Sequence, residues 1–475
     1  MLEYIHLDDS ILFDTYCVSE INGFIDLTEY ILDEIGLRND KSRDYYKKRD
    51  FLRNMLANLY ISERINRPVA ISKDRNSWKC VERYHKLFMT YRTMKFVFDR
   101  MTSAKLIVSY KGFNIPKTSF SYNTRFHATS KLENLINRFV PTLEFIPAEL
   151  DQDYILLKDQ KKFLSGYEDD ENTVEMRRQL TDYNEFMSDQ EISISLDHIL
   201  EPLSKTIREY QLKGFLTIPN SNYNTNSPTP SNLTPYPLHT ITQNVHYNEQ
   251  EAWLLGLKQV RSSRIFNTDF SHGGRFYHSI HLVFGKEQRK EIRINGERTC
   301  ELDYSSLHPR MLYNMSGIAF EGDCYSDISD SQEERELVKE VMLTMINISK
   351  EKKDKLPASV NKEIKKHNSR QKFLPVGQRI YKKGIPYKKV WEYADRIEKY
   401  HSPIAEYFNS GIGLRLQNLD SHIMSNVLND CYREKVASLP VHDSCIVKER
   451  DKDFLYSSMV RNYQKVMNGY TPVIK

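Results

Sequence analysis

The fold of this chain is decided by two short stretches, Glu301–Arg310 (ELDYSSLHPR) and Leu439–Val447 (LPVHDSCIV). Each stretch places one aspartate, Asp303 or Asp443, at the edge of an apolar run that is typical of a buried β-strand. A buried carboxylate is costly unless a cation or another partner neutralises it. Two such carboxylates suit a pair of Mg²⁺ ions about 3.5–4 Å apart, which activate a hydroxyl and stabilise a leaving phosphate. Two sheet-edge aspartates with ordinary partners are the alternative.

Length and composition set the broad class. The 475 residues are enough for about two to four domains. Lys and Arg number 68 against 64 acidic residues, and the resulting net charge of +4 is too mild to identify a polyanionic partner. The six cysteines lack the spacing of a zinc site or a disulfide framework, which favours a reducing, cytoplasmic location. No stretch approaches the roughly 20 apolar residues of a membrane span, so no membrane partner is expected.

The domain organisation follows from breaks in the pattern. Residues 219–249 are rich in Pro, Ser and Asn, which predicts a linker. Upstream of it we expect an N-terminal domain over residues 1–150 and a helical, thumb-like part over residues 151–218, for which an ordinary helical bundle is the alternative. Downstream, residues 250–475 would form one further domain, with a mainly helical part at about 320–400.

One segment of the N-terminal domain resembles a known DNA-binding arrangement. Residues 78–101 predict a core-facing helix with a basic outer face, and residues 105–110 and 124–129 predict a two-stranded ribbon with a long tip. A basic helix followed by a ribbon is the layout of a winged helix-turn-helix, in which the helix enters a major groove and the ribbon contacts phosphate. A packing unit with a solvated basic face is the alternative.

The C-terminal half carries its signals in a fixed order. Gly274 and Arg275 come first and suit contact with a nucleic-acid backbone, because glycine lets a backbone approach closely. Asp303 follows, then Arg335 and Lys339 at helical i,i+4 spacing. Two cations on one helix face suit a triphosphate, and the lysine can donate a proton to departing pyrophosphate. A solvated basic face is the alternative for this stripe. A lysine-rich segment with interleaved aromatic residues, 350–393, suits a single-stranded template, and a solvated helical surface is the alternative.

At this point residues 264–475 resemble the family A DNA polymerases and the related single-subunit phage-type RNA polymerases. The metal-binding Asp-Tyr-Ser run of motif A is matched by Asp303–Ser305, and its arginine seven positions on by Arg310. The Arg and Lys of the motif B fingers helix are matched by Arg335 and Lys339. By this resemblance Asp303 and Asp443 bind two Mg²⁺ ions, with Mn²⁺ as a substitute, and Tyr304 belongs to the nucleotide site.

Further matches in the same family concern the nucleic acid. The Gly-Arg element that contacts primer and template is matched by Gly274–Arg275. Motif C is His-Asp-Glu in the DNA polymerases and His-Asp-Ser in the phage-type RNA polymerases, so His442–Ser444 follows the latter. A polar residue before motif C corresponds loosely to Gln417. The resemblance thus assigns Arg275, Gly274, Arg310, Gln417 and His442 to nucleic-acid binding.

Two departures bear on the choice of nucleotide. His308 occupies the sugar-gate position, where bulk crowds a ribose 2′-hydroxyl and favours deoxynucleotides. Asn347 replaces an aromatic ring that stacks under the incoming sugar, and Leu343 replaces the other ring of motif B. An imidazole can also hydrogen-bond a 2′-hydroxyl, which leaves discrimination open.

The sequence therefore predicts an α+β fold: a right-hand polymerase palm with an antiparallel sheet, helical fingers and thumb, and a mainly helical N-terminal domain for which a winged helix is one arrangement. The expected function is template-directed DNA synthesis on a primer–template from nucleoside triphosphates, without proofreading, because no exonuclease motif is recognisable. The alternatives are an RNA polymerase or primase-like enzyme, a template-independent nucleotidyltransferase, and a catalytically inactive DNA-binding regulator. RNA is an alternative partner. The oligomeric state is not predicted.

Overall fold

A computed structural model of the chain describes residues 10–15, 17, 19, 21–38, 42, 44–78, 83–84, 90–114, 121–141, 153–195, 216–217, 254–257, 262–370 and 381–475. The chain divides into two compact units. The N-terminal unit comprises Met1–Asp153 and Leu203–Lys258, and the C-terminal unit comprises Tyr154–Pro202 and Gln259–Lys475. Both units mix helices and strands, so the fold class is α+β. The predicted linker, residues 219–249, lies outside the described residues.

The N-terminal unit is built on a small sheet whose strands lie in the order β1-β2-β6-β3. Strands β2 and β3 both pair antiparallel with β6, and β1 pairs parallel with β2. Its described helices are α1 (Asn22–Glu34), α2 (Tyr45–Ile65), α3 (Tyr91–Ser103) and α4 (Ser130–Phe139), with the short 3₁₀ turn η1 (Arg75–Trp78). Its described strands are β1 (Ile11–Leu12), β2 (Val69–Ile71), β3 (Ile107–Tyr110), β4 (Phe113–Asn114), β5 (Ser121–Tyr122), β6 (Thr124–Ala128), β9 (Leu216–Thr217) and β10 (Leu254–Leu257).

A single apolar core holds this unit together. The helices pack buried side chains such as Phe24, Phe51, Met55 and Phe98 against strand residues such as Phe126. Helix α3 begins at Tyr91 because Thr90 caps it by accepting a hydrogen bond from the amide of Thr93 at 3.2 Å. The helix is therefore shorter than the predicted 78–101, of which 79–82 and 85–89 lie outside the described residues. The ribbon follows at β3 and β6, and β4 pairs with β5 beyond it.

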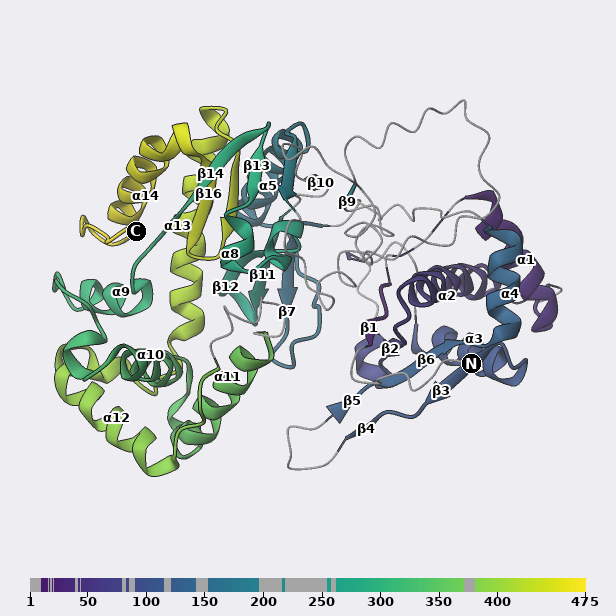
Figure 1. The fold of residues 1–475 in the computed structure, drawn as a ribbon, viewed down its shortest axis with the longest axis horizontal. Coiled ribbons are helices and arrows are strands. Elements are labelled where there is room, and N and C mark those ends of the chain that lie inside the picture. Colours follow the sequence, from purple (N-terminus) through teal and green to yellow (C-terminus); the bar gives the residue numbers. More distant parts are fainter. Residues whose placement is uncertain are drawn as a thin grey trace, which may run out of the picture. The chain divides into compact units, whose positions relative to one another are not determined.

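The C-terminal unit contains an antiparallel arrangement of β15-β16-β14-β13-β8 and a smaller sheet of order β12-β11-β7 (Figure 1). Its described strands are β7 (Ile155–Lys158), β8 (Ile192–Ser195), β11 (Ser263–Asn267), β12 (Asp269–Tyr277), β13 (Ile292–Ile294), β14 (Glu297–Asp303), β15 (Ser438–Val441) and β16 (Ser444–Lys448). Its described α-helices are α5 (Glu171–Ser188), α8 (Lys286–Arg289), α9 (Leu307–Met315), α10 (Gln332–Asn347), α11 (Leu356–Arg370), α12 (Tyr387–Tyr400), α13 (Gly413–Arg433) and α14 (Lys452–Val466). The 3₁₀ turns are η2 (Ile280–Val283), η3 (Ser326–Ile328), η4 (Lys350–Lys355), η7 (Ser402–Tyr407) and η8 (Glu449–Asp451).

Residues 154–202 are part of this unit, whereas the sequence predicted a separate thumb-like part over 151–218. Strand β7 pairs in parallel with β11, more than 100 residues later, and β8 pairs with β13. Helix α5, which starts at a capping box of Asp170 and Thr173, is fixed to β15 because the buried Tyr183 hydroxyl donates to the carbonyl of Ser438 at 2.6 Å. These long-range pairings, which no local pattern reveals, join the segment to the sheet.

The helices α10, α11 and α12 contact one another and form a helical group within 320–400, the region predicted to be mainly helical (Figure 1). Helix α10 starts at Gln332 because Ser331 accepts a hydrogen bond from the amide of Glu334 at 3.1 Å. Its buried face carries Val338, Val341, Met342 and Met345. Part of the lysine-rich segment, residues 371–380, lies outside the described residues.

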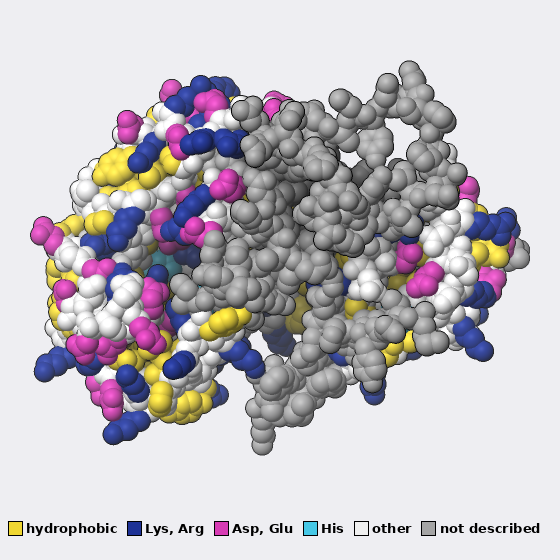
Figure 2. All heavy atoms as spheres, in the orientation of Figure 1, with side chains coloured by type: hydrophobic (Ala, Val, Ile, Leu, Met, Phe, Trp, Pro, Cys, Tyr) yellow, Lys and Arg dark blue, Asp and Glu magenta, His cyan; other side chains and the backbone are white. Residues whose placement is uncertain are grey.

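Surface charges of both signs are interspersed. Figure 2 shows Lys and Arg side chains among Asp and Glu side chains on the face in view of the C-terminal unit. This mixture matches the net charge of +4. The overall charge therefore does not locate a polyanion site on this unit. Among the described helices, none combines the length and the apolarity that crossing a bilayer requires.

Candidate active site

Asp303 and Asp443 lie side by side at one end of a β-sheet. Asp303 is the last residue of β14, and β14 pairs antiparallel with β16 so that Asp303 faces Ser444. Asp443 belongs to the two-residue turn between β15 and β16. The amide of Tyr304 donates to the carbonyl of Asp443 at 3.3 Å, which ties the two segments together directly. The chain thus brings together two carboxylates that are 140 positions apart in sequence.

The backbone of Asp303 is held from its other side as well. Its amide donates to the carbonyl of Lys475 at 3.0 Å, and its carbonyl accepts from the amide of Lys475 at 2.9 Å. An antiparallel bridge joins Tyr304 to Ile474. Asp303 is therefore fixed between two neighbouring segments, and its carboxylate has little freedom to move away from Asp443.

The two carboxylates repel each other. Burial, and then the neighbouring Asp443 carboxylate, raise the pKa of Asp303 to about 6, while Lys286 and Lys339 act in the opposite direction. Within the described part of the chain, neither aspartate side chain forms an ion pair or accepts a hydrogen bond from another side chain. This is what a site for an external cation requires, because a structural aspartate is normally neutralised by partners of its own.

The donor set fits Mg²⁺. Mg²⁺ is usually held by one or two carboxylates, and waters and substrate phosphates complete its shell. Asp303 and Asp443 supply two carboxylates at a half-buried position. No group of three or more His, Cys, Asp or Glu side chains that could hold a metal occurs among the residues described. The arrangement therefore suits an ion that shares its coordination with a phosphorylated substrate.

The raised pKa of Asp303 predicts that metal affinity depends on pH. A proton competes with the metal below pH about 6, so affinity should fall roughly tenfold for each pH unit below that value and level off above pH about 7. Titration of the full chain with Mn²⁺ by isothermal calorimetry from about pH 5 to 8 measures this. A constant affinity across that range would contradict the assignment of Asp303 as a ligand.

A third acidic residue, Glu301, lies two positions before Asp303 on the same strand, but it is neutralised by partners of its own. Arg289 binds it through two hydrogen bonds of 2.9 and 3.0 Å, and the Ser444 hydroxyl donates to it at 2.6 Å. Burial opposes ionisation, yet these partners lower the pKa of Glu301. Ser444, the serine of the His-Asp-Ser run, therefore positions the hairpin through Glu301.

His442, the residue before Asp443, occupies the first position of the turn between β15 and β16, with φ of 59°. Such a left-handed backbone conformation is uncommon outside glycine, asparagine and aspartate, and it suits the tight connection between β15 and β16. Its ring lies 5.5 Å from that of Tyr277. Burial, and then the Arg275 guanidinium, lower the pKa of His442, so it acts as a neutral ring near neutral pH. Its predicted contact with nucleic acid stays a prediction.

A second polar cluster joins three elements next to this turn. Arg275 at the end of β12 donates through Nε to the Asp420 carboxylate at 3.0 and 3.1 Å, and its Nη2 also contacts that carboxylate. His308 on α9 contacts the same carboxylate through Nε2 at 2.8 Å. Burial opposes the charge on Arg275, but Asp420 outweighs it and raises the pKa of that guanidinium. Asp420 thus holds both Arg275 and His308 in place.

Sequence reasoning missed Asp420 and chose Gln417 instead. Both residues lie on α13, but the Asp420 side chain is only 1% exposed, whereas Gln417 is half-buried. A single acidic residue between the apolar positions Leu416 and Ile423, at helical spacing on the buried face of α13, was the available signal. A carboxylate at such a position demands a cationic partner, and Arg275 supplies it.

Gly273 and Gly274 have a structural role. Both adopt positive φ, 76° and 88°. A Cβ on Gly274 would lie 2.5 Å from the ring of Phe266 and 2.9 Å from the Ser421 hydroxyl. The buried Arg264 completes this contact by donating through Nε to the Gly274 carbonyl at 2.8 Å. The glycines therefore let β12 pack closely against β11 and α13, and this packing sets the position of Arg275.

Helix α10 carries Arg335, Lys339 and Asn347, which were predicted to bind the nucleotide, but these three side chains differ in what they contact. Arg335 is bound to Asp323 at 2.5 Å and to Glu336 at 3.1 Å. Asn347 donates to the carbonyl of Leu343 at 2.7 Å and lies beside Gly413. Lys339 is half-buried, makes no ion pair within the described part of the chain, and is close enough to Asp303 to lower its pKa. Of the two predicted phosphate-binding cations, Lys339 is thus the one available to a ligand.

Arg310 and Tyr304, two further predicted site residues, have structural contacts. The Arg310 guanidinium donates to three backbone carbonyls, those of Ser305, Phe320 and Gly322, at 3.1, 2.5 and 2.5 Å. The Tyr304 side chain is 3% exposed, and its hydroxyl donates to the carbonyl of Met459 at 2.7 Å. The ring of Tyr304 therefore packs in the interior, which leaves almost none of it for a nucleotide. Arg310 fixes the loop after α9.

Comparison with known proteins adds no assignment. No protein-family profile matches this chain, and the search of curated proteins finds no match either.

Proposed function

We propose that the protein is a Mg²⁺-dependent nucleotidyltransferase, most simply a DNA polymerase of the family A type. The observation that carries this proposal is the pairing of Asp303 with Asp443 without neutralising partners among the described residues. Two adjacent carboxylates at the end of a sheet, with a half-buried lysine nearby, are the minimum set of side chains that a two-metal nucleotide site needs.

Each residue has a distinct role in the proposed reaction. Asp303 and Asp443 hold two Mg²⁺ ions, which supply activation of the primer hydroxyl and neutralisation of the triphosphate. Lys339 binds the phosphates and donates a proton to pyrophosphate as it leaves. Arg275 on β12 of the smaller sheet, held by Asp420, contacts the primer–template.

The choice of sugar depends on His308. Its contact with Asp420 keeps the ring in one place, and a rigid ring at the sugar-gate position disfavours a ribose 2′-hydroxyl on steric grounds. Deoxynucleotides are therefore the preferred substrate in this proposal. The His442–Ser444 run supports the competing assignment, an RNA polymerase or primase-like enzyme, although Ser444 has a structural partner in Glu301.

One assay tests the proposal. The purified full chain is incubated with Mg²⁺ or Mn²⁺, with primed, unprimed and template-free substrates, and with dNTPs or NTPs in turn. We expect primer extension with dNTPs that requires a template and is absent from an Asp443→Asn preparation made in parallel. Equal incorporation by Asp443→Asn would reject the site. No incorporation by the unaltered chain, together with sequence-specific duplex binding, would favour an inactive DNA-binding regulator.

Replacing Lys339 by alanine is expected to lower kcat/KM for the incoming nucleotide by about 10²-fold, since one charge-assisted contact to a triphosphate is worth about 2–3 kcal/mol. The matched control is Lys366→Ala, an exposed lysine on α11 that pairs with Glu363. Steady-state single-nucleotide incorporation measures both variants. Equal effects in the two variants would remove Lys339 from the nucleotide site.

A further inference from the structure

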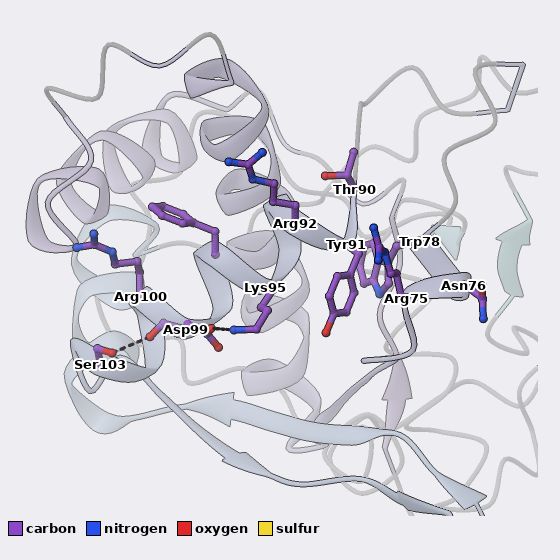
Figure 3. Close-up of a pocket in the computed structure, with 11 residues that line it drawn as sticks. Arg75, Asn76, Trp78, Thr90, Tyr91, Arg92, Lys95, Asp99, Arg100 and Ser103 are labelled. Carbon is purple, nitrogen blue, oxygen red and sulfur yellow. Dashed lines mark hydrogen bonds and ion pairs between the residues drawn. The ribbon is translucent and has the colours of Figure 1, made fainter.

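The N-terminal unit contains an open pocket of about 1080 Å³ along the outer face of α3. The inner face of this helix is buried through Met94, Val97, Phe98 and Met101. The side chains on its outer face line the pocket instead, together with three residues of η1 (Figure 3). The lining comprises Arg75, Asn76, Trp78, Thr90, Tyr91, Arg92, Lys95, Phe96, Asp99, Arg100 and Ser103.

Positive charge dominates this pocket. Four of the lining residues are cations and one is an acid, which leaves three net positive charges. The acid, Asp99, is already paired with Lys95 at 2.5 Å, and Asp99 raises the pKa of that lysine. Arg75, Arg92 and Arg100 form no ion pair within the described residues. Three guanidinium groups without carboxylate partners, two on α3 and one on η1, thus line one pocket, and they suit an anionic ligand.

Aromatic rings lie between these cations. Tyr91 and Phe96 are half-buried and line the pocket, and the Arg100 guanidinium lies 5.4 Å from the centroid of the Phe96 ring. Trp78 at one end is fixed, because its Nε1 donates to the carbonyl of Ser72 at 2.7 Å and its ring packs on Phe51. Guanidinium groups next to firmly held rings match the alternation of phosphate with sugar and base along a nucleic-acid strand.

We propose that this pocket binds the phosphodiester backbone of a nucleic acid, independently of the catalytic function proposed for the C-terminal unit. Arg75, Arg92 and Arg100 bind phosphates, and Tyr91 and Phe96 contact the sugars or bases between them. The pocket lies on the helix that precedes the ribbon of β3 and β6, the position at which the sequence predicted a DNA-contacting helix. The shared chemistry is a phosphate chain, and the test distinguishes a single strand from a duplex.

The test measures binding of the full chain, without nucleotides, to fluorescent single-stranded and duplex oligonucleotides over a series of KCl concentrations. The variant Arg92→Ala/Arg100→Ala should bind at least one of the two forms about tenfold or more weakly, and its plot of log Kd against log salt should lose a slope of about 2, one unit for each phosphate contact. The matched control is Lys131→Ala/Arg138→Ala, which removes two exposed cations of α4 outside the pocket.

A second variant predicts a change of opposite sign. Asp99→Asn removes the only acid among the described residues that line the pocket and frees Lys95. It should therefore tighten binding and add about one unit to the salt slope. If neither variant differs from the control for either oligonucleotide, the pocket is not a nucleic-acid site. Primer extension at saturating DNA is expected to be unchanged in both variants, so failure of this inference and failure of the catalytic proposal give different results.

Discussion

Replacing Asp303 by asparagine is expected to abolish nucleotide incorporation, with a loss of at least about 10³-fold, and at the same time to stabilise the metal-free protein at pH about 8. The loss follows from removal of a metal ligand. The stabilisation follows from the raised pKa of Asp303, about 6 in the fold. A carboxyl whose folded pKa exceeds its unfolded pKa stabilises the fold below the unfolded value, and that stability is lost as the pH rises through about 6.

At pH 8 the charged Asp303 is therefore a cost to the fold. After allowance for solvent screening the cost is about 1–2 kcal/mol, which corresponds to a rise in Tm of roughly 2–4 °C on substitution. Thermal unfolding in EDTA at pH 8 and pH 5 measures it, and the gain should shrink at the lower pH. The control is Glu301→Gln, which breaks the contacts with Arg289 and Ser444 and should lower Tm. If Asp303→Asn lowered Tm as Glu301→Gln does, Asp303 would be an ordinary structural carboxylate.

The second large effect concerns Asp420. Its truncation to alanine leaves Arg275 buried without its carboxylate and releases His308, so the expected loss in unfolding free energy is about 3–5 kcal/mol. Because the two released side chains stand beside the proposed nucleotide and primer sites, we also expect the ratio of dNTP to NTP incorporation to fall by about tenfold. Chemical denaturation and paired single-nucleotide assays measure the two effects.

Asp430→Ala is the matched control for that experiment. Asp430 lies on the same helix, α13, and accepts hydrogen bonds from Ser458, Arg461 and Asn462. Its loss should also destabilise the protein, but it should leave sugar selection unchanged. Equal sugar selection in both variants would reduce Asp420 to a purely structural residue. Asp420→Asn, which keeps the shape of the side chain, should recover part of the selectivity.

The parts of the site that sequence predicts best are those with a local pattern. The strands that carry Asp303 and Asp443 follow from the apolar residues around them, and α10 follows from the i,i+4 spacing of Arg335 and Lys339. The pairing of those strands agrees with the expectation, because two buried carboxylates with no partners nearby in sequence needed a common site.

The parts that sequence misses depend on contacts between distant segments. Asp420 belongs to no motif, and its importance appears only when α13 packs against β12. Tyr304 was assigned to a nucleotide because it follows Asp303, yet the alternation of side chains at the end of a strand turns its ring inward, toward Met459. The predicted thumb-like part, residues 151–218, does not reveal that 154–202 belong to the C-terminal unit, because the parallel pairing of β7 with β11 leaves no local trace.

The pairing of β14 with β16 also has a consequence for biosynthesis. Residues 299–303 pair with residues 444–448, so a chain emerging from the ribosome cannot complete the two-carboxylate site until its last hairpin has been translated. Contacts of such long sequence separation form late, since loop closure must precede them. A partly synthesised chain would therefore lack the proposed two-carboxylate metal site, and interrupted translation would yield fragments without it.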